Sequence, residues 1–252
     1  MSSSSPAQQR SVQDADTRLP IYQRLRDLFM QKIRAGEWAG SEALPSEIEL
    51  ALAHGVAPGT VRKAIESLVA DGYLVRHQGK GTFVRRADFG SALFRFFRHT
   101  DPSGQVVQPT SNILLLGRSK PSATELAKLN LKTADSVIRI RRLRSFEREP
   151  WIFEEISVSS QTFAPLLDAD RASFGDLLYP TYESLCKVRV HRVLDTIRFG
   201  FATPVVAKHL QTEAGEPVAI IERQAFSIDD RPIEWRVSYG LASRFSYSVE
   251  LK

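Results

Sequence analysis

The spacing of apolar residues in the first third of the chain constrains its fold more than any other feature. Over residues 21–33 and again over residues 61–68, apolar side chains recur every three or four positions, which predicts two amphipathic helices. Between them, Ser46 and Glu49 have the spacing of a capping box, which predicts the start of a short additional helix. Pro58 suits the first position of the last helix, because that position needs no backbone N–H donor. The sequence therefore predicts three successive helices, the last two separated by a tight turn.

A basic hairpin is expected directly after the third helix. Two short segments, residues 73–77 and 82–86, flank the glycine-containing turn at residues 78–81. Three helices followed by a hairpin are typical of a winged helix-turn-helix, whose third helix enters the major groove of DNA while the hairpin contacts the backbone or minor groove. The segment 74–87 contains four basic residues and no acidic one. A solvated surface hairpin is the alternative interpretation of this segment.

The composition excludes several classes of protein. With 252 residues, 42% of them hydrophobic and 25% charged, the chain is expected to fold into one large or two modest globular domains. No apolar run reaches the roughly 18 residues of a membrane-spanning helix, so no membrane partner is expected. The N-terminus lacks the features of a secretory signal, and the single cysteine, Cys186, cannot form an intrachain disulfide. We therefore expect a cytoplasmic protein, and its net charge of +5 is compatible with a nucleic-acid partner.

The N-terminal third resembles the GntR family of bacterial transcription regulators. Separated motifs in the family order carry this resemblance: LPSE at 44–47, GV at 55–56, TVRKA at 60–64, DGYL at 71–74 and QGKGTFV at 78–84. The resemblance implies a DNA-binding surface on the third helix, the second-helix cap and the hairpin tip. Its residues are Ser46, Gly59, Thr60, Arg62, Lys63, Gln78, Gly79 and Lys80.

Arg62 is the first candidate for base readout. It matches a family arginine near the start of the helix, lies off the apolar stripe, and carries donors that suit guanine O6 and N7 or a phosphate. For Gly79 the alternative is purely structural, since a tight turn also needs a residue that tolerates positive φ. Many family members carry an arginine where this chain has Ile48, and a polar or basic residue where it has Pro58. We therefore expect an unusual operator, or a larger share of the readout from Arg62 and the hairpin.

The remainder of the chain alternates between strand-like segments and short helical ones. Short turns at residues 147–150 and 229–231 join strands into antiparallel hairpins, so the expected fold class is α+β, an antiparallel sheet with packed helices. Strands are predicted over residues 137–146, 151–158, 188–201, 218–227, 232–239 and 245–251, and helices over 122–130, 162–167, 174–185 and 204–211.

This second part resembles the UTRA effector-binding domain of the HutC subfamily, whose fold is similar to chorismate lyase. The motifs are RLR at 142–144, EP at 149–150, GEPV at 215–218, RPIEWR at 231–236 and RFSY at 244–247. The resemblance implies a small anionic metabolite as effector. The residues that would bind it are Arg142, Arg144, Glu154, Ser173, Glu234 and Tyr239.

Strand alternation supports part of that set. Arg142 and Arg144 share one face of their strand, as two guanidinium groups converging on a phosphate or carboxylate would require. A cross-strand ion pair with Glu154 or Glu155 on a solvated face is the alternative, and Glu234 and Tyr239 also have purely structural alternatives. Gly175 stands where relatives that bind phosphorylated sugars carry a tyrosine, two positions after the matched serine.

The expected organisation is a disordered tail (1–18), a winged helix-turn-helix (19–86), a linker (87–92) and an effector domain (93–252). The predicted function is a sequence-specific transcription regulator, a metabolite-responsive repressor. One reading head covers only a half-site, so a homodimer on a near-palindromic DNA operator is expected.

No catalytic residue, metal site or cofactor is expected. The five histidines are scattered without metal-ligand spacing, and no phosphate loop or nucleophile elbow is present. Two other functions remain open. One is a lyase-like enzyme acting on small molecules and tethered to DNA, and the other is a nonspecific nucleic-acid-binding protein.

Overall fold

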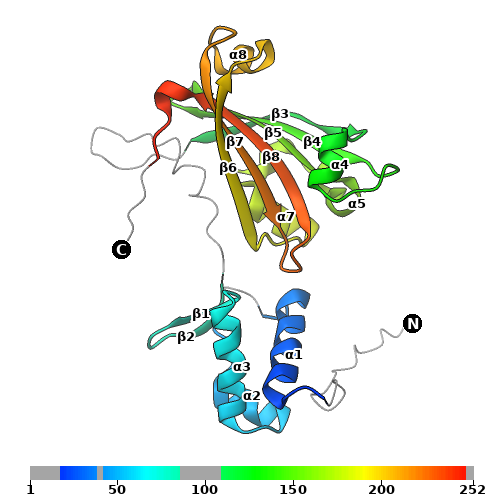
Figure 1. The fold of residues 1–252 in the computed structure, drawn as a ribbon, viewed down its shortest axis with the longest axis vertical. Helices are drawn as coiled ribbons and strands as arrows, with labels where there is room; N and C mark the ends of the chain where they lie inside the picture. Colours follow the sequence, from blue (N-terminus) through cyan, green and yellow to red (C-terminus); the bar gives the residue numbers. More distant parts are fainter. Residues whose placement is uncertain (1–17, 39–41, 86–108, 248–252) are drawn as a thin grey trace. The chain divides into compact units, whose positions relative to one another are not determined.

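The computed structural model describes residues 18–38, 42–85 and 109–247 (Figure 1). The chain divides into two compact units, Met1–Arg86 and Ala87–Lys252, which are described separately below. The expected tail, apart from Arg18, lies outside the described residues, as do the expected linker 87–92 and residues 93–108 of the expected effector domain.

The first unit consists of three helices and a hairpin, in the order that the sequence predicts. They are α1 (Ile21–Ala35), α2 (Glu47–His54), α3 (Pro58–Ala70), β1 (Leu74–His77) and β2 (Gly81–Val84). The capping box at Ser46 and Glu49 is formed, and Pro58 occupies the start of α3, so both local predictions are confirmed. The apolar stripes of the helices meet in one core. Its members include Leu25, Phe29, Ile33, Leu50, Val61, Ile65, Leu68, Leu74 and Val84.

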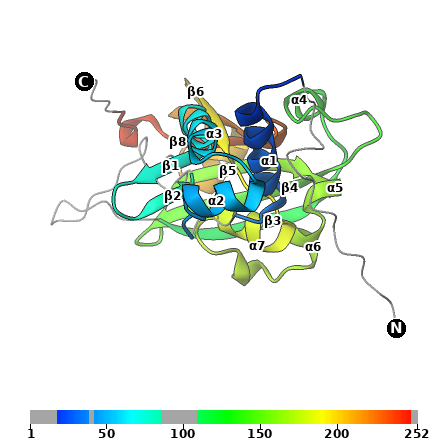
Figure 2. The ribbon, with the colours of Figure 1, turned by 90° about the horizontal axis from the view of Figure 1, so that it is seen from below.

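The hairpin is built around glycines that adopt left-handed backbone angles. Gly79 has φ of 73° and Gly81 has φ of 113°, conformations that side chains with a Cβ rarely adopt. The backbone N–H of Leu44 donates to the carbonyl oxygen of Thr82 at 2.7 Å, which fixes the entry to α2 against β2. The β1–β2 hairpin extends to one side of the three helices in both views (Figures 1 and 2).

The second unit is a six-stranded sheet with helices on both faces. Its strands are β3 (Thr110–Ser119), β4 (Val137–Phe146), β5 (Glu149–Ser159), β6 (Arg192–Phe201), β7 (Pro217–Phe226) and β8 (Pro232–Leu241). The spatial order is β3-β4-β5-β8-β7-β6, and every neighbouring pair is antiparallel. The β4–β5 and β7–β8 hairpins therefore meet along β5 and β8 at the centre of the sheet.

Successive side chains of a strand point to opposite faces of the sheet, and different helices cover the two faces. On one face, Ile156 of β5 belongs to a core with α5 (Ser160–Phe163), α6 (Pro165–Asp168) and α7 (Leu178–Cys186). On the other face, Phe153 of β5 packs with α8 (Pro204–Leu210). The short helix α4 (Ala123–Lys128) lies on this second face, where Gln224 donates to the carbonyl oxygen of Lys128 at 2.5 Å. The fold class is α+β.

Two sequence predictions need correction, and one strand was missed. The helix expected over 174–185 begins only at Leu178, since Gly175 has φ of 57° and ψ of −176° and follows a 3₁₀ turn over Arg171–Phe174. The last strand is absent from residues 245–247, the described part of the range expected for it. The edge strand β3 was not predicted, because its consecutive apolar residues do not alternate, and a register shift lies between Ile113 and Leu115.

Within the described ranges, no helix is long and apolar enough to cross a membrane. The same residues contain no group of three or more histidine, cysteine, aspartate or glutamate side chains placed to hold a metal ion.

Candidate functional site

The exposed face of α3 carries the first candidate site. Arg62 lies in the second turn of α3, opposite the buried stripe formed by Val61, Ile65 and Leu68, and its side chain is 60% exposed. Gly59 and Lys63 are also exposed, and Thr60 is half-buried. The sequence therefore places a guanidinium group on the solvent face of the helix that is expected to read DNA.

An acidic residue on α2 holds this guanidinium. Glu47 Oε2 accepts from Arg62 Nε at 2.9 Å, and Glu47 Oε1 accepts from Arg76 Nη2 at 2.8 Å. The hydrogen bond and the negative charge of Glu47 raise the pKa of Arg62. One carboxylate thus connects the start of α2, the α3 arginine and strand β1 of the hairpin.

The other residues predicted to bind DNA differ in what they contact. The Ser46 hydroxyl takes part in the capping box, where it accepts from the backbone N–H of Glu49 at 3.2 Å. The ammonium group of Lys63 lies 4.2 Å from the centre of the Tyr22 ring on α1, a cation–π contact. The remaining members are exposed at the hairpin tip. They are Gln78, Gly79 and Lys80.

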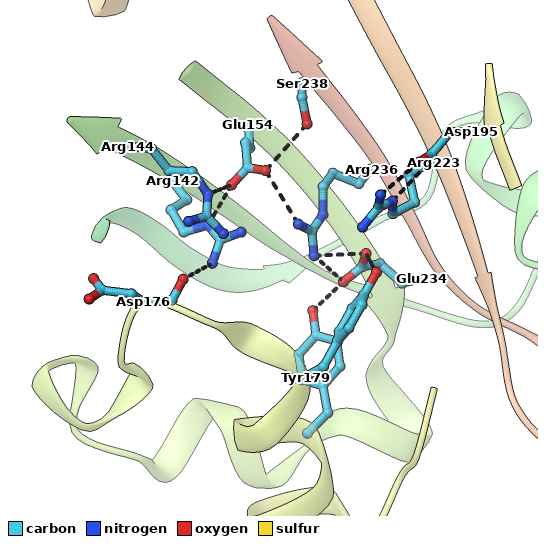
Figure 3. A network of polar contacts seen from close by, with 11 residues as sticks. Arg142, Arg144, Glu154, Asp176, Tyr179, Asp195, Arg223, Glu234, Arg236 and Ser238 are labelled. Carbon is cyan, nitrogen blue, oxygen red and sulfur yellow. Dashed lines mark hydrogen bonds and ion pairs between the residues drawn. The ribbon is translucent and has the colours of Figure 1, made fainter. Parts of the chain in front are cut away.

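A buried cluster of charged side chains forms the second candidate site, on the face of the sheet that α5 to α7 cover (Figure 3). At its centre is the fully buried carboxylate of Glu154 on β5. Its Oε2 accepts from Arg142 Nε at 2.5 Å and from Arg144 Nε at 3.2 Å, both on β4. Its Oε1 accepts from Arg236 Nη1 and from Ser238 Oγ on β8, each at 3.3 Å.

The cluster continues along β8, β7 and β6. Glu234 accepts from Arg236 Nη2 at 2.9 Å and from the Tyr182 hydroxyl at 2.7 Å. Beyond it, Arg223 on β7 makes two hydrogen bonds of 2.7 Å to the carboxylate of Asp195 on β6. We call these seven ionic residues the arginine cluster. They are Arg142, Arg144, Glu154, Asp195, Arg223, Glu234 and Arg236.

The charges within the arginine cluster shift the pKa values of Glu154 and Arg144. Burial alone raises the pKa of Glu154, but the positive charges of Arg142, Arg144 and Arg236 outweigh it and hold that pKa far below its usual range. Burial, followed by repulsion from Arg142, lowers the pKa of Arg144 to about 10. Glu154 and Arg144 are therefore both ionised near neutral pH.

An open hollow of about 510 Å³ adjoins this cluster. Asp176 lines it, and the backbone oxygen of Asp176 lies 3.5 Å from Arg142 Nη1. Figure 3 shows the side chain of Asp176 directed away from Arg142; its carboxylate accepts from the backbone N–H of Ser111 at 2.7 Å. Ser173, predicted to bind an anion, lines the hollow and is exposed, and its hydroxyl donates to the carbonyl oxygen of Asp170 at 2.6 Å.

The structure brings together Arg142, Arg144, Glu154 and Glu234, but it does not bring Tyr239 to them. Tyr239 pairs with Phe153 across β5 and β8 and belongs to the core under α8, on the opposite face of the sheet. The expectation that Tyr239 lines the effector site is therefore corrected. The ion pair named as an alternative does form at Glu154, but it is buried and not on a solvated face.

Sequence reasoning missed several members of this site. They are Arg236, Arg223, Asp195, Tyr179 and Tyr182, and the hydroxyls of both tyrosines donate to Glu234. One signal was present, because Glu234, Arg236 and Ser238 alternate along one strand and must share a face. Asp195 and Arg223 are adjacent only through the register of β6 on β7. No local pattern in the sequence indicated that register.

Comparison with known proteins identifies both units. Residues 104–246 match the family described as the UTRA domain, and residues 20–84 match the bacterial regulatory proteins of the gntR family.

Two full-length relatives are similar over most of the chain. One, from Escherichia coli (strain K12), is named "Probable fructoselysine utilization operon transcriptional repressor"; it is 28% identical over 232 residues, which cover 92% of this chain and 95% of that protein. The other is a histidine utilization repressor of Pseudomonas aeruginosa, 27% identical over 90% of this chain and 89% of its own length. Among solved structures, the ligand-binding domain of a protein assigned to the GntR-family regulators of Bordetella bronchiseptica superimposes with a TM-score of 0.55, at 26% identity over 67% of this chain and all of that one.

Proposed function

Because the chain belongs to the GntR family of bacterial regulators and carries a UTRA domain, we propose that it acts as a homodimeric repressor on a near-palindromic DNA operator. A small anionic metabolite bound in the second unit alters its affinity for that operator. Proteins of this kind are metabolite-responsive DNA-binding regulators, and the relatives described above are named as repressors. The site of action is the bacterial cytoplasm, at the nucleoid, where the operator lies.

The observation that carries this proposal is the exposed guanidinium of Arg62 on α3. The fork of donors on an arginine matches the O6 and N7 acceptors of guanine in the major groove. Glu47 holds this side chain at Nε, and the exposure of the group leaves room for a base edge or phosphate to approach it. Arg62 is therefore the first base-reading residue of the operator complex.

The other DNA contacts are assigned by position. Gly59 and Thr60 lie in the first turn of α3, where backbone N–H groups and a small side chain suit a phosphate. Gln78, Gly79 and Lys80 form the exposed hairpin tip, which suits the backbone or minor groove. Ser46 and Lys63 complete the surface. We assign them to phosphate contacts and not to base contacts, because their polar groups already contact Glu49 and Tyr22, respectively.

We infer a homodimer because each chain supplies one winged helix-turn-helix. Two such units related by a two-fold axis double the contacts to a palindrome. Strand β6 supports this assignment. It ends the described sheet, and its Leu194, Phe199 and Phe201 are exposed. Sedimentation velocity is expected to give a dimer that Phe201→Glu weakens and Leu185→Glu, on α7, does not. A monomer in solution and on DNA would contradict the proposal.

The effector is assigned to the arginine cluster, at Arg142 and Arg144, with Glu154 as the acid that orients these two guanidinium groups and Glu234 as the acid that holds Arg236. Ser173 lies at the entrance, on the hollow that Asp176 shares with Arg142. An effector that binds one conformation of the dimer more tightly lowers or raises operator affinity by that difference, typically about 1–3 kcal/mol. The released state is the one whose two heads no longer match the half-site spacing.

A catalytic role is not proposed. The charged groups of the arginine cluster are all engaged in ion pairs, and none is placed as a nucleophile beside a general base. The tethered-lyase alternative predicts product formation from chorismate-like acids, and the nonspecific alternative predicts equal affinity for all duplexes. Selection of bound duplexes from a random pool, followed by titration of the selected site against a scrambled one, tests the proposal. Equal affinity for the two duplexes would overturn it.

A further inference from the structure

The acceptor sites of Glu154 are fully occupied by the protein itself. A carboxylate offers about four lone-pair sites. Two are taken by Arg142 and Arg144 on Oε2, and two by Arg236 and Ser238 on Oε1. A ligand hydroxyl or ammonium group therefore finds no acceptor on this carboxylate.

Glu234, the second fully buried acid, is occupied in the same way. The hydroxyls of Tyr179 and Tyr182 donate to its two oxygens at 3.2 and 2.7 Å. Arg236 Nη2 lies 2.9 Å from both oxygens. Arg236 thus bridges Glu154 and Glu234 and takes acceptor sites on each of them, while its own side chain is buried.

Donors, in contrast, are in excess. Arg142 Nη2 and Arg236 Nε are buried and have no hydrogen-bond acceptor among the residues that the structure describes. The arginine cluster also contains four guanidinium groups and three carboxylates, so these seven side chains together carry a net charge of +1. Buried polar groups are normally hydrogen-bonded, so two unsatisfied donors in one buried cluster favour a ligand that supplies acceptors. Both imbalances are relieved by one bound anion and worsened by a bound cation.

We propose that Arg236 determines the ligand class of this site. By filling acceptor sites on Glu154 and Glu234, Arg236 restricts the effector to a compact anion that presents only acceptors to the cluster, and it excludes ligands that carry an ammonium group next to the anion. This inference rests on the proposed function, which places the effector at Arg142 and Arg144. Arg236 itself donates its free Nε–H to the anion.

A matched pair of probes tests this selectivity. Ethyl phosphate and 2-aminoethyl phosphate differ by one ammonium group and are otherwise similar in size. Isothermal titration of the full chain is expected to show at least tenfold tighter binding of ethyl phosphate. In Arg236→Gln, which frees acceptor sites on both glutamates and removes the excess charge, that preference is expected to fall at least fivefold. Equal binding of the two probes to the wild-type chain, or an unchanged preference in Arg236→Gln, overturns the inference.

Two further variants keep the test decisive if Arg236→Gln does not fold. Glu234→Gln retains Arg236 and raises the excess positive charge, so the preference for ethyl phosphate is expected to grow at least threefold; no growth counts against the inference. Arg141→Gln is the matched control. Arg141 is adjacent to Arg142 on β4, but it points to the opposite face, where it pairs with half-exposed Glu155, so the preference must remain unchanged.

The outcomes separate the inference from the proposed function. If both probes bind equally well, and Arg142→Gln abolishes binding of both, the effector site is correct and the role of Arg236 is wrong. If neither probe binds, or if binding is indifferent to Arg142→Gln, the effector site itself is misplaced and the inference falls with it.

Discussion

Glu47 Oε2 lies 2.9 Å from Arg62 Nε, so an acid at the start of α2 holds the arginine on the face of α3 opposite its buried stripe. The same carboxylate holds Arg76 of the hairpin. Both pairs are solvent-exposed, and surface ion pairs of this kind contribute little to folding because water and salt screen them. The contacts therefore matter more for the orientation of the two arginines than for the stability of the unit.

Replacement of Arg62 by alanine is expected to weaken specific operator binding by about 1–3 kcal/mol and to relax the base preference at one position of each half-site. Gel-shift titration at fixed salt on the selected operator measures the loss. Arg26→Ala is the matched control, because it removes the same charge from the unit. Arg26 pairs with Asp71 at the far end of α3. Unchanged operator affinity in Arg62→Ala would remove Arg62 from the readout.

Replacement of Glu47 by glutamine is expected to raise affinity for random duplex DNA about threefold. It is also expected to narrow the gap between the affinities for the specific site and for random duplexes. Loss of a negative charge beside two arginines strengthens attraction to phosphates, which is independent of sequence. The glutamine amide also keeps only one acceptor oxygen for the two arginines, which weakens the hold on the orientation of Arg62. Fluorescence anisotropy with both duplexes measures the two affinities. Glu37→Gln, which releases Lys32 on α1, should leave the gap unchanged; an equal change in both variants would contradict a specific role for Glu47.

The first unit follows closely from its sequence, because local interactions determine it. The capping box, Pro58 and the hairpin glycines each act on residues close to them in the sequence. As the spacing predicts, the box is formed, Pro58 starts α3 and the hairpin glycines adopt positive φ. In the sheet, strand periodicity correctly placed Arg142 and Arg144 on one face.

The error at Tyr239 has an equally simple cause. Glu234 and Tyr239 are five positions apart on one continuous strand, so alternation already places them on opposite faces. Residues assigned to a site by a family motif must therefore be checked for the face of the strand on which they lie. The Asp195–Arg223 pair is a different case, since it depends on which strands become neighbours, and neighbours distant in sequence are not encoded locally.

Replacement of Glu154 by glutamine is expected to lower the free energy of unfolding by about 3–5 kcal/mol, the usual cost of removing one partner from a buried ionic network. Arg142, Arg144 and Arg236 would then share a buried site without the carboxylate that compensates them. Urea unfolding followed by circular dichroism measures the change. Glu155→Gln, on the other face and paired with Arg141 at the surface, is expected to cost less than about 1 kcal/mol. Equal losses in both variants would mean that the cluster is not a coupled network.

Glu125 provides a prediction of pH dependence that is independent of either binding site. Burial raises its pKa, but hydrogen bonds from Arg139, from the backbone of Ser122 and from Ser157 outweigh burial and lower it from 4.5 to about 2. A carboxyl whose pKa is lower in the folded state contributes stability that is fully present above pH 4.5 and is lost as the pH falls through about 2.

The free energy of unfolding of the wild-type chain is therefore expected to fall as the pH is lowered from about 5 toward about 2. The decrease should be smaller in Glu125→Gln, which is already less stable at pH 7 because it has lost the ion pair with Arg139. Urea midpoints at several pH values measure both curves. Glu213→Gln, an exposed site, serves as the control and should parallel the wild type. If the stability curve of Glu125→Gln also runs parallel to that of the wild type over this range, the acid-sensitive carboxyl lies elsewhere. Glu154 is then the next residue to test by the same comparison, because neighbouring arginines also lower its pKa.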